Sequence, residues 1–201
     1  MNKHERRSRA AYNKKALGYD DTFEGKFTLS YNELLAKRAD IQDGDAVLDV
    51  ACGNGRLLKM FARRHAIRGY GIDIAENMIA QAASQNHGMQ FTAGSCEALP
   101  YPDAVMDVVT VSAAYHHFPH VTLFVREAYR VLAPHGKIYI AEVYYPTFYR
   151  VLFSPLLPLL QEGDVKFYSP KAIMRTLGEA GFTKCGHEIS GNIQLVYAEK
   201  L

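Results

Sequence analysis

Short apolar runs alternate with longer amphipathic segments through most of this chain, and this alternation constrains the fold more than any other feature. The apolar runs cover residues 47–50, 69–73, 89–93, 107–111 and 137–143. Helices are expected between them, over residues 27–39, 56–65, 76–85 and 123–132, the last ended by the turn Pro134-His135-Gly136. Such alternation is typical of a parallel β-sheet covered by helices. The sequence therefore predicts an α/β fold.

The C-terminal part of the chain breaks this pattern. The segment 144–168 is rich in aromatic residues, leucine and proline, and we expect it to form a helical insertion or lid. A helix is predicted over 170–180, and two further runs, 184–189 and 193–199, flank the hairpin signal Ser190-Gly191-Asn192. The hairpin adds one antiparallel strand to an otherwise parallel sheet. Seven strands in a mostly parallel sheet, with helices on both faces, are therefore expected.

Composition and charge narrow the class of protein. The 201 residues suit a single domain, 1–201, and 48% hydrophobic with 22% charged residues is typical of a soluble globular protein. The net charge of +2 gives no sign of a nucleic-acid partner. The three cysteines form no C-x-x-C pair, no metal site is predicted, and the most apolar stretch is about half the length of a membrane span. We expect a cytoplasmic protein without a membrane span.

The first strand ends in an acidic residue and runs into a glycine-rich loop that opens a helix. Residues 47–56 read VLDVACGNGR, which includes Asp49, Gly53 and Gly55. This stretch resembles the cofactor motif of class I S-adenosylmethionine-dependent methyltransferases, with Ala51 where the motif usually has its first glycine. The resemblance implies a Rossmann-like class I methyltransferase fold. It also implies that Asp49 holds the cofactor's ammonium group while the loop lets the adenosine lie against backbone.

A second acidic residue, Asp73, ends the next apolar run. In a Rossmann-like sheet an acid at this strand end accepts hydrogen bonds from both ribose hydroxyls. A nicotinamide-dependent reductase is the main rival, because it shares this fold and a similar ribose acid. Its G-x-G-x-x-G fingerprint would start at Gly53 and require a glycine at position 58, where this chain has Leu58. In addition, the carboxylate of Asp49 would place negative charge beside the pyrophosphate of the nicotinamide cofactor. The sequence favours the methyltransferase.

The loop after the third strand reads GSCEALPY over 94–101 and resembles the family's adenine-binding loop. In many relatives an aspartate there accepts a hydrogen bond from the adenine amino group. Ser95 stands in its place, and Cys96 stands where a small residue is usual. The resemblance therefore implies that Ser95 binds adenine, together with backbone groups of Cys96 and Glu97.

Further residues are expected around the same cofactor. Ile74 and Met78 follow the ribose acid and could pack on the adenine faces, although Met78 equally fits a core position at helical spacing. Residues 1–40 are predicted as N-terminal cap helices. Within them YNKKALGYD resembles the cap helix of many small-molecule methyltransferases, and its Tyr12 and Tyr19 could reach the cofactor's carboxylate.

The segment after the fourth strand, SAAYHHF over 112–118, resembles the family segment whose polar residue faces the methyl acceptor. We assign Ser112 to the cofactor site and Tyr115 and His116 to the acceptor pocket. His116 is the candidate general base, since a histidine titrates near neutrality, and His117 is given a structural role. The alternative is that the two histidines only form a hydrogen-bonded turn, because an acceptor that is already nucleophilic needs no base.

The resemblance to small-molecule methyltransferases, including the quinone-biosynthesis type, extends over nearly the whole chain. It implies S-adenosylmethionine as cofactor and a small-molecule acceptor. The aromatic residues of 144–168 either contact an apolar or aromatic acceptor, or pack on the domain or across a homodimer interface.

Two other functions stay open. One is a non-catalytic protein that binds S-adenosylmethionine or S-adenosylhomocysteine. The other is a protein or RNA methyltransferase, which the basic N-terminal segment would favour and the low net charge opposes.

Overall fold

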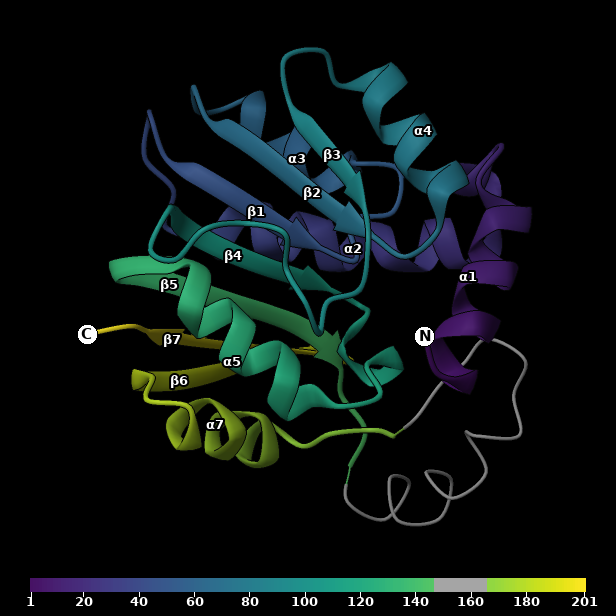
Figure 1. Ribbon diagram of the computed structural model, residues 1–201. Helices are drawn as coiled ribbons and strands as arrows, with labels where there is room; N and C mark the ends of the chain where they lie inside the picture. The colour runs from purple at the N-terminus through teal and green to yellow at the C-terminus, as the bar shows by residue number, and fades with distance from the viewer. Residues whose placement is uncertain (147–165) are drawn as a thin grey trace.

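The strands lie in one sheet, in the order β3-β2-β1-β4-β5-β7-β6 (Figure 1). The computed structural model describes residues 1–146 and 166–201. Their strands are β1 (Ala46–Val50), β2 (Arg68–Asp73), β3 (Gln90–Ala93), β4 (Met106–Ser112), β5 (Leu132–Val143), β6 (Thr183–Ser190) and β7 (Ile193–Glu199). β7 pairs antiparallel with both β5 and β6, and the other pairs are parallel. The predicted fold class, including the antiparallel hairpin strand, is confirmed.

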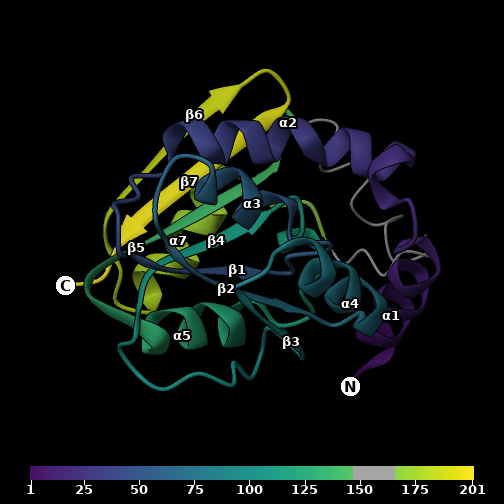
Figure 2. The same cartoon turned by 90° about the horizontal axis from the view of Figure 1, so that it is seen from above.

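Helices cover both faces of this sheet. They are α1 (Lys3–Lys15), α2 (Phe23–Arg38), α3 (Arg56–Ala62), α4 (Glu76–Gln85), α5 (Val121–Val131) and α7 (Pro170–Glu179), with short 3-10 turns at Tyr19–Asp21 and Tyr115–His117. Figures 1 and 2 show α5 and α7 on one face and α2 and α3 on the other. Every residue of β1 is buried, because helices lie over both faces.

The parallel strands bring the predicted site to one edge. Val50 of β1 pairs with Ile72 of β2 and with Val111 of β4, so the carboxyl ends of the three strands lie next to one another. In open sheets of this type, ligands bind outside these ends, where the strand order reverses. Here the order reverses between β1 and β4.

The structure corrects three predicted boundaries. α2 begins before residue 27, because Thr22 caps it by accepting a hydrogen bond from the N–H of Gly25 at 3.0 Å. α3 ends at Ala62 rather than at residue 65. Residues 134–136 are not a separate turn but part of β5. The N–H of His135 donates to the carbonyl of Lys200 at 2.8 Å, so the C-terminal tail pairs with the start of this strand.

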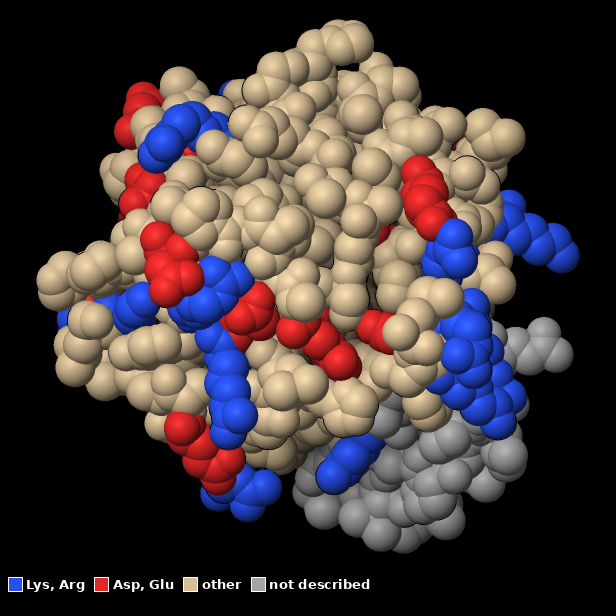
Figure 3. Space-filling model, viewed as in Figure 1, with Lys and Arg blue, Asp and Glu red and all other residues tan. Residues whose placement is uncertain are grey.

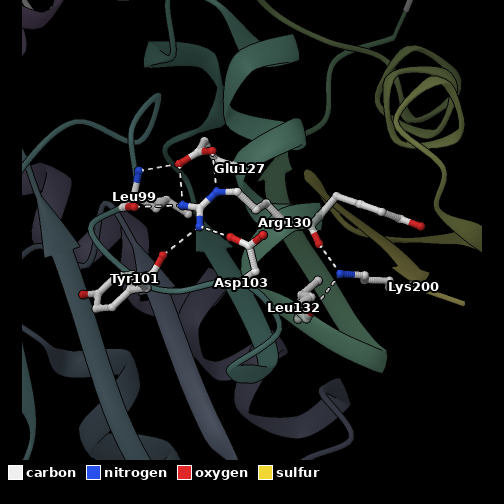
Figure 4. A network of polar contacts seen from close by, with 8 residues as sticks. Leu99, Tyr101, Asp103, Glu127, Arg130, Leu132 and Lys200 are labelled. Atoms are coloured by element: carbon white, nitrogen blue, oxygen red, sulfur yellow. Dashed lines mark hydrogen bonds and ion pairs between the residues drawn. The ribbon is translucent and has the colours of Figure 1, made fainter.

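Arg130 ties α5 to the loop between β3 and β4 (Figure 4). Its guanidinium donates to both carboxylate oxygens of Glu127, three residues earlier on the same helix, at 2.8 Å. It also donates to Asp103 and to the carbonyls of Leu99 and Tyr101. The five hydrogen bonds fix the course of residues 99–103 after the predicted adenine loop.

The N-terminal helix α1 has two polar faces. Figure 3 shows lysine and arginine side chains gathered on the side of the molecule where α1 lies in Figure 1. Lys3, Arg6 and Lys14 are exposed on that outer face, whereas Glu5 and Ser8 are buried on the inner face. These three residues of the basic N-terminal segment therefore lie on a solvated helix face, whereas Arg9 and Lys15 form ion pairs with Glu76 and Glu24. Most of the predicted lid, residues 147–165, lies outside the described residues. Among the described residues, none of the helices is long and apolar enough to cross a bilayer.

Candidate cofactor and acceptor site

A cavity opens at the carboxyl ends of β1, β2 and β4, roofed by α1. Its lining comes from α1, the loops after β1 and β3, the end of β2 and the segment after β4. Predicted residues that line it are Tyr12, Tyr19, Ala51, Gly53, Asp73, Ile74, Met78, Ser95, Cys96 and Ser112. A smaller adjoining cavity contains Asp49 and shares Tyr19, Ala51, Gly53 and Ser112 with the first. The structure thus brings together most of the cofactor residues predicted from the sequence.

Asp73 both shapes the loop and faces the cavity. Its Oδ2 accepts the N–H of Gly53 and its Oδ1 accepts the N–H of Ala75, each at 2.9 Å. Burial raises the pKa of Asp73, and the hydrogen bonds from backbone N–H groups counter that rise. Each carboxylate oxygen has a second lone pair, so Asp73 can still accept hydrogen bonds from ribose hydroxyls.

Asp49 is a buried carboxylate in the smaller cavity. Its Oδ1 accepts a hydrogen bond from the hydroxyl of Thr110 at 2.8 Å. Burial raises the pKa of Asp49 to about 7, against the effect of the Thr110 hydrogen bond and with a further contribution from the charge of Asp73. Among the residues that the structure describes, no cation forms an ion pair with Asp49, and a buried acid in this state favours a positively charged ligand group. This environment fits the ammonium group of S-adenosylmethionine.

The two loop glycines have different roles. Gly53 has a φ of +52° and lines both cavities, and a Cβ built there would point into open space. A ligand can therefore approach its backbone closely. Gly55, by contrast, does not line either cavity. A Cβ on Gly55 would lie 2.7 Å from Nδ2 of Asn86 and 3.2 Å from Cβ of Ala82. Its predicted role in cofactor binding is corrected to packing between α3 and α4.

Ala51 departs from the family motif at a cost in backbone energy. Its φ is +59°, in the left-handed region that glycine adopts readily and alanine does not. The residue lines both cavities next to Gly53. The alanine keeps the conformation that the usual glycine would supply, at the expense of backbone strain.

The predicted adenine residues also lie around the larger cavity, on the loop after β3, just after β2 and on α4. Ile74, Ser95 and Cys96 line it, and Met78 also lines it although the side chain is only 1% exposed and packs in the core. The side chain of Glu97 does not line this cavity, because its carboxylate accepts a hydrogen bond from the N–H of His120. The N–H of Glu97 donates to the hydroxyl of Ser95 at 3.2 Å.

The segment after β4 is oriented differently from the prediction. Tyr115 is fully buried and packs edge to face on Phe124 and Tyr168 in the core, so it does not contact an acceptor in the cavity. Its predicted role is corrected to core packing. His117, for which we predicted only a structural role, lines the larger cavity, and its Nε2 lies 3.1 Å from the hydroxyl oxygen of Tyr12.

His116 does not line either cavity; its ring lies 4.1 Å from that of His117, measured between centroids, and it is bound to a buried acid. Its Nδ1 lies 2.9 Å from both carboxylate oxygens of Glu142, whose side chain is fully buried. Burial alone raises the pKa of Glu142, but the charge and hydrogen bonds of His116 outweigh it, so this pKa lies below its usual range. An ionised carboxylate only accepts, so in the neutral imidazole Nδ1 carries the ring proton and Nε2 is the basic nitrogen.

Sequence reasoning missed two carboxylates at this site. Glu142 stands in the buried second half of β5, and an acid within a buried apolar run is itself a signal of function. Glu5 lines the cavity from α1, but its position in a charged, basic stretch gives no such signal.

Comparison with known proteins identifies the family. Residues 48–140 match a family model described as a methyltransferase domain. A ubiquinone/menaquinone biosynthesis C-methyltransferase of Rickettsia akari is 29% identical over 184 residues, covering 76% of this chain and 74% of that protein. A demethylmenaquinone methyltransferase of Thermus thermophilus is 30% identical over 162 residues, covering 68% and 74%. A Rickettsia bellii relative is 32% identical, but the chain spans only 56% of its length.

Solved structures share the fold. An S-adenosylmethionine-dependent methyltransferase of Aquifex aeolicus superposes with a TM-score of 0.72 at 21% identity, covering 94% of this chain and 98% of the other. A phosphoethanolamine N-methyltransferase of Haemonchus contortus, solved with S-adenosylhomocysteine, has a TM-score of 0.70 at 15% identity and covers 86% and 53%. Together with the cavity and its two acids, these relationships exclude the reductase. The chain belongs to the class I S-adenosylmethionine-dependent methyltransferases, of the kind that methylate small molecules.

Proposed function

We propose that this enzyme methylates a ring carbon of an apolar, hydroxylated aromatic acceptor of the quinol type, with His116 as the base that removes the hydroxyl proton. The observation that carries the proposal is the pair of His116 and the buried Glu142 beside the cavity. Relatives from Rickettsia akari and Thermus thermophilus support the acceptor class, since they are named for C-methylation in quinone biosynthesis and for methylation of demethylmenaquinone.

The surroundings of His116 suit a flat apolar ring. The ring of Phe167 lies 6.4 Å from that of His116, and Tyr145 lies 4.7 Å from Phe167, measured between ring centroids. The ring of His117 lies 4.1 Å from that of His116 on the side of the cavity. An aromatic acceptor that packs among these rings would bring its hydroxyl group to the imidazole.

The chemistry requires little beyond positioning and one base. When bound, S-adenosylmethionine supplies an electrophilic methyl group on a sulfonium. Nε2 of His116 takes the hydroxyl proton of the acceptor, and Glu142 stabilises the resulting imidazolium. The ring carbon next to that oxygen then forms its bond to the methyl group as the S–CH₃ bond breaks. The proton on that carbon is then released to solvent, and the imidazolium of His116 returns its proton to the oxygen, which restores the aromatic ring and its hydroxyl group.

A labelled-methyl assay tests this function. The acceptor probe is 1,4-dihydroxynaphthalene, kept reduced, and 1,4-dimethoxynaphthalene serves as the control without a hydroxyl proton. We expect label on a ring carbon of the first compound, identified by ¹³C NMR, and none on the second. Label on oxygen, or absence of transfer to the dihydroxy compound, would contradict the proposed acceptor.

Variants test the base. His116→Asn keeps an N–H that can donate to Glu142, so the buried acid retains a partner, but it has no basic nitrogen. We expect it to lower kcat by about 10²–10⁴-fold and to leave the affinity for S-adenosylhomocysteine unchanged. His120→Ala is the matched control, because Nδ1 of His120 lies 3.0 Å from Glu97 in a similar pair whose histidine is exposed on the surface. Normal turnover by His116→Asn would remove the base from the mechanism.

A further inference from the structure

Glu5 of α1 places a carboxylate against Ser95 of the loop that follows β3. The hydroxyl of Ser95 donates a hydrogen bond to Oε1 of Glu5 at 2.7 Å, between residues 90 positions apart in the chain. Both residues line the larger cavity, beside Ile74 and Cys96. The N-terminal helix therefore brings a carboxylate to a point where the loop itself carries only a hydroxyl group.

Several contacts fix α1 over the cavity. Arg9 pairs with Glu76 at the start of α4, and the side-chain oxygen of Asn13 accepts the N–H of Asn77 at 2.9 Å. At the far end of the cavity the hydroxyl of Tyr12 meets His117. These contacts hold the inner face of α1, and with it Glu5, against the loop that follows β3.

The bonding of Glu5 leaves acceptor capacity in the cavity. Its Oε2 accepts the N–H of Asn2 at 2.8 Å in the capping box of α1, and the N-terminal ammonium lies 4.0 Å from the same oxygen. Its Oε1 accepts from Ser95 alone among the described contacts. Each oxygen of an ionised carboxylate can accept two hydrogen bonds, so Oε1 can take one more. The residue is 8% exposed, so that bond would form largely away from water.

We propose that Glu5, oriented by Ser95, accepts a hydrogen bond from the adenine amino group and thereby selects adenosine-containing cofactors. A carboxylate is only an acceptor, so it pairs with an amino group and repels a carbonyl oxygen at the same position. Ser95 cannot play this part in the same way, because its own proton points to Glu5 and its oxygen already accepts the N–H of Glu97.

The test compares two ligands that differ at one substituent. S-adenosylhomocysteine carries the amino group, and S-inosylhomocysteine carries a carbonyl oxygen there. Calorimetric titration of the wild-type protein should show a preference of at least about thirtyfold for the first ligand. Glu5→Gln keeps the capping box, since glutamine also serves at that position. Its amide can donate to the carbonyl, so we expect the preference to fall below about threefold.

Two further variants separate recognition from docking of the helix. Glu76→Gln weakens the contact with Arg9 outside the larger cavity, and it should weaken both ligands equally without changing their ratio. Glu5→Gln combined with Ser95→Asp returns a carboxylate to the adenine loop and should restore the preference. If Glu5→Gln weakens both ligands by the same factor, Glu5 acts only by holding α1 in place. If it changes neither affinity, Glu5 does not contact the cofactor. Either result would overturn the proposal.

Discussion

The hydroxyl of Thr110 on β4 donates a 2.8 Å hydrogen bond to Oδ1 of Asp49 on β1, and both side chains are buried. This one bond does not offset the loss of water around the carboxylate. The pKa of Asp49 is therefore raised to about 7, chiefly by burial. Asp49 is expected to be ionised only in part near neutrality until a cationic group enters the cavity.

Binding of S-adenosylhomocysteine should therefore depend on pH. Its ammonium group binds the ionised form of Asp49, so below pH 7 binding has to release a proton. The affinity should rise by up to about tenfold per pH unit as the pH increases to 7, and then level off. Calorimetry between pH 5.5 and 8, in two buffers with different ionisation enthalpies, measures both the affinity and the proton release. An affinity that does not change with pH would show that Asp49 does not hold the ammonium.

Asp49→Asn should weaken this ligand while stabilising the protein at high pH. The folded pKa of Asp49 lies above its unfolded value, so the folded state binds more protons between about pH 4 and pH 7. The wild-type free energy of unfolding therefore falls as the pH rises through this window. Asparagine does not titrate and can still accept from Thr110. At pH 8 we expect the variant to be more stable by on the order of 1–4 kcal/mol, with a smaller gain at pH 5. Denaturant unfolding at both pH values measures this difference, and lower stability at pH 8 would contradict it.

Ala51→Gly should stabilise the protein by up to about 1 kcal/mol. The left-handed conformation costs roughly 1–2 kcal/mol for alanine, and glycine removes this cost. Glycine also has a larger conformational entropy in the unfolded chain, which offsets part of the increase in the free energy of unfolding. Ala83→Gly, at an exposed position inside α4, is the control and should destabilise by about 0.5–1 kcal/mol. If both variants lose stability equally, the backbone at Ala51 is not strained.

Arg130→Lys should destabilise the protein, because an ammonium group cannot reproduce the planar set of five hydrogen bonds to Glu127, Asp103 and the loop carbonyls. The side chain is 30% exposed, so we expect a modest loss of about 1–2 kcal/mol in denaturant unfolding. The neighbouring Arg126→Lys, at an exposed position, should change little. An equal response of both variants would show that the network in Figure 4 contributes no stability.

Local patterns in the sequence were enough to predict the sheet and the two acids at its edge. Asp49 and Asp73 follow apolar runs, and parallel pairing alone brings such strand ends together. The directions of side chains in the 3-10 turn Tyr115–His117 were not predictable in this way. A shift of this turn by one residue would exchange which of the two histidines faces the cavity. The position of the turn is set by the packing of Tyr115 into the core, which local sequence does not specify.

Contacts between distant segments were also beyond the sequence patterns. Glu5 meets Ser95, and Glu142 meets His116, only after the sheet and the N-terminal helix have come together. The start of β5 was mispredicted for the same reason. Pro134 and Gly136 are typical of a turn, but pairing with the C-terminal Lys200 extends the strand through them.

The two acids of the cavity also bear on how much of this enzyme a cell retains. Asp49 and Asp73 are both buried, and neither has an ion-pair partner among the described residues. A ligand that binds only the folded chain and supplies a cation to one of them shifts the balance between folded and unfolded molecules by mass action. Unfolded chains are the ones that proteases remove. The steady-state abundance of this methyltransferase is therefore expected to follow the supply of its methyl donor, with no regulatory protein required.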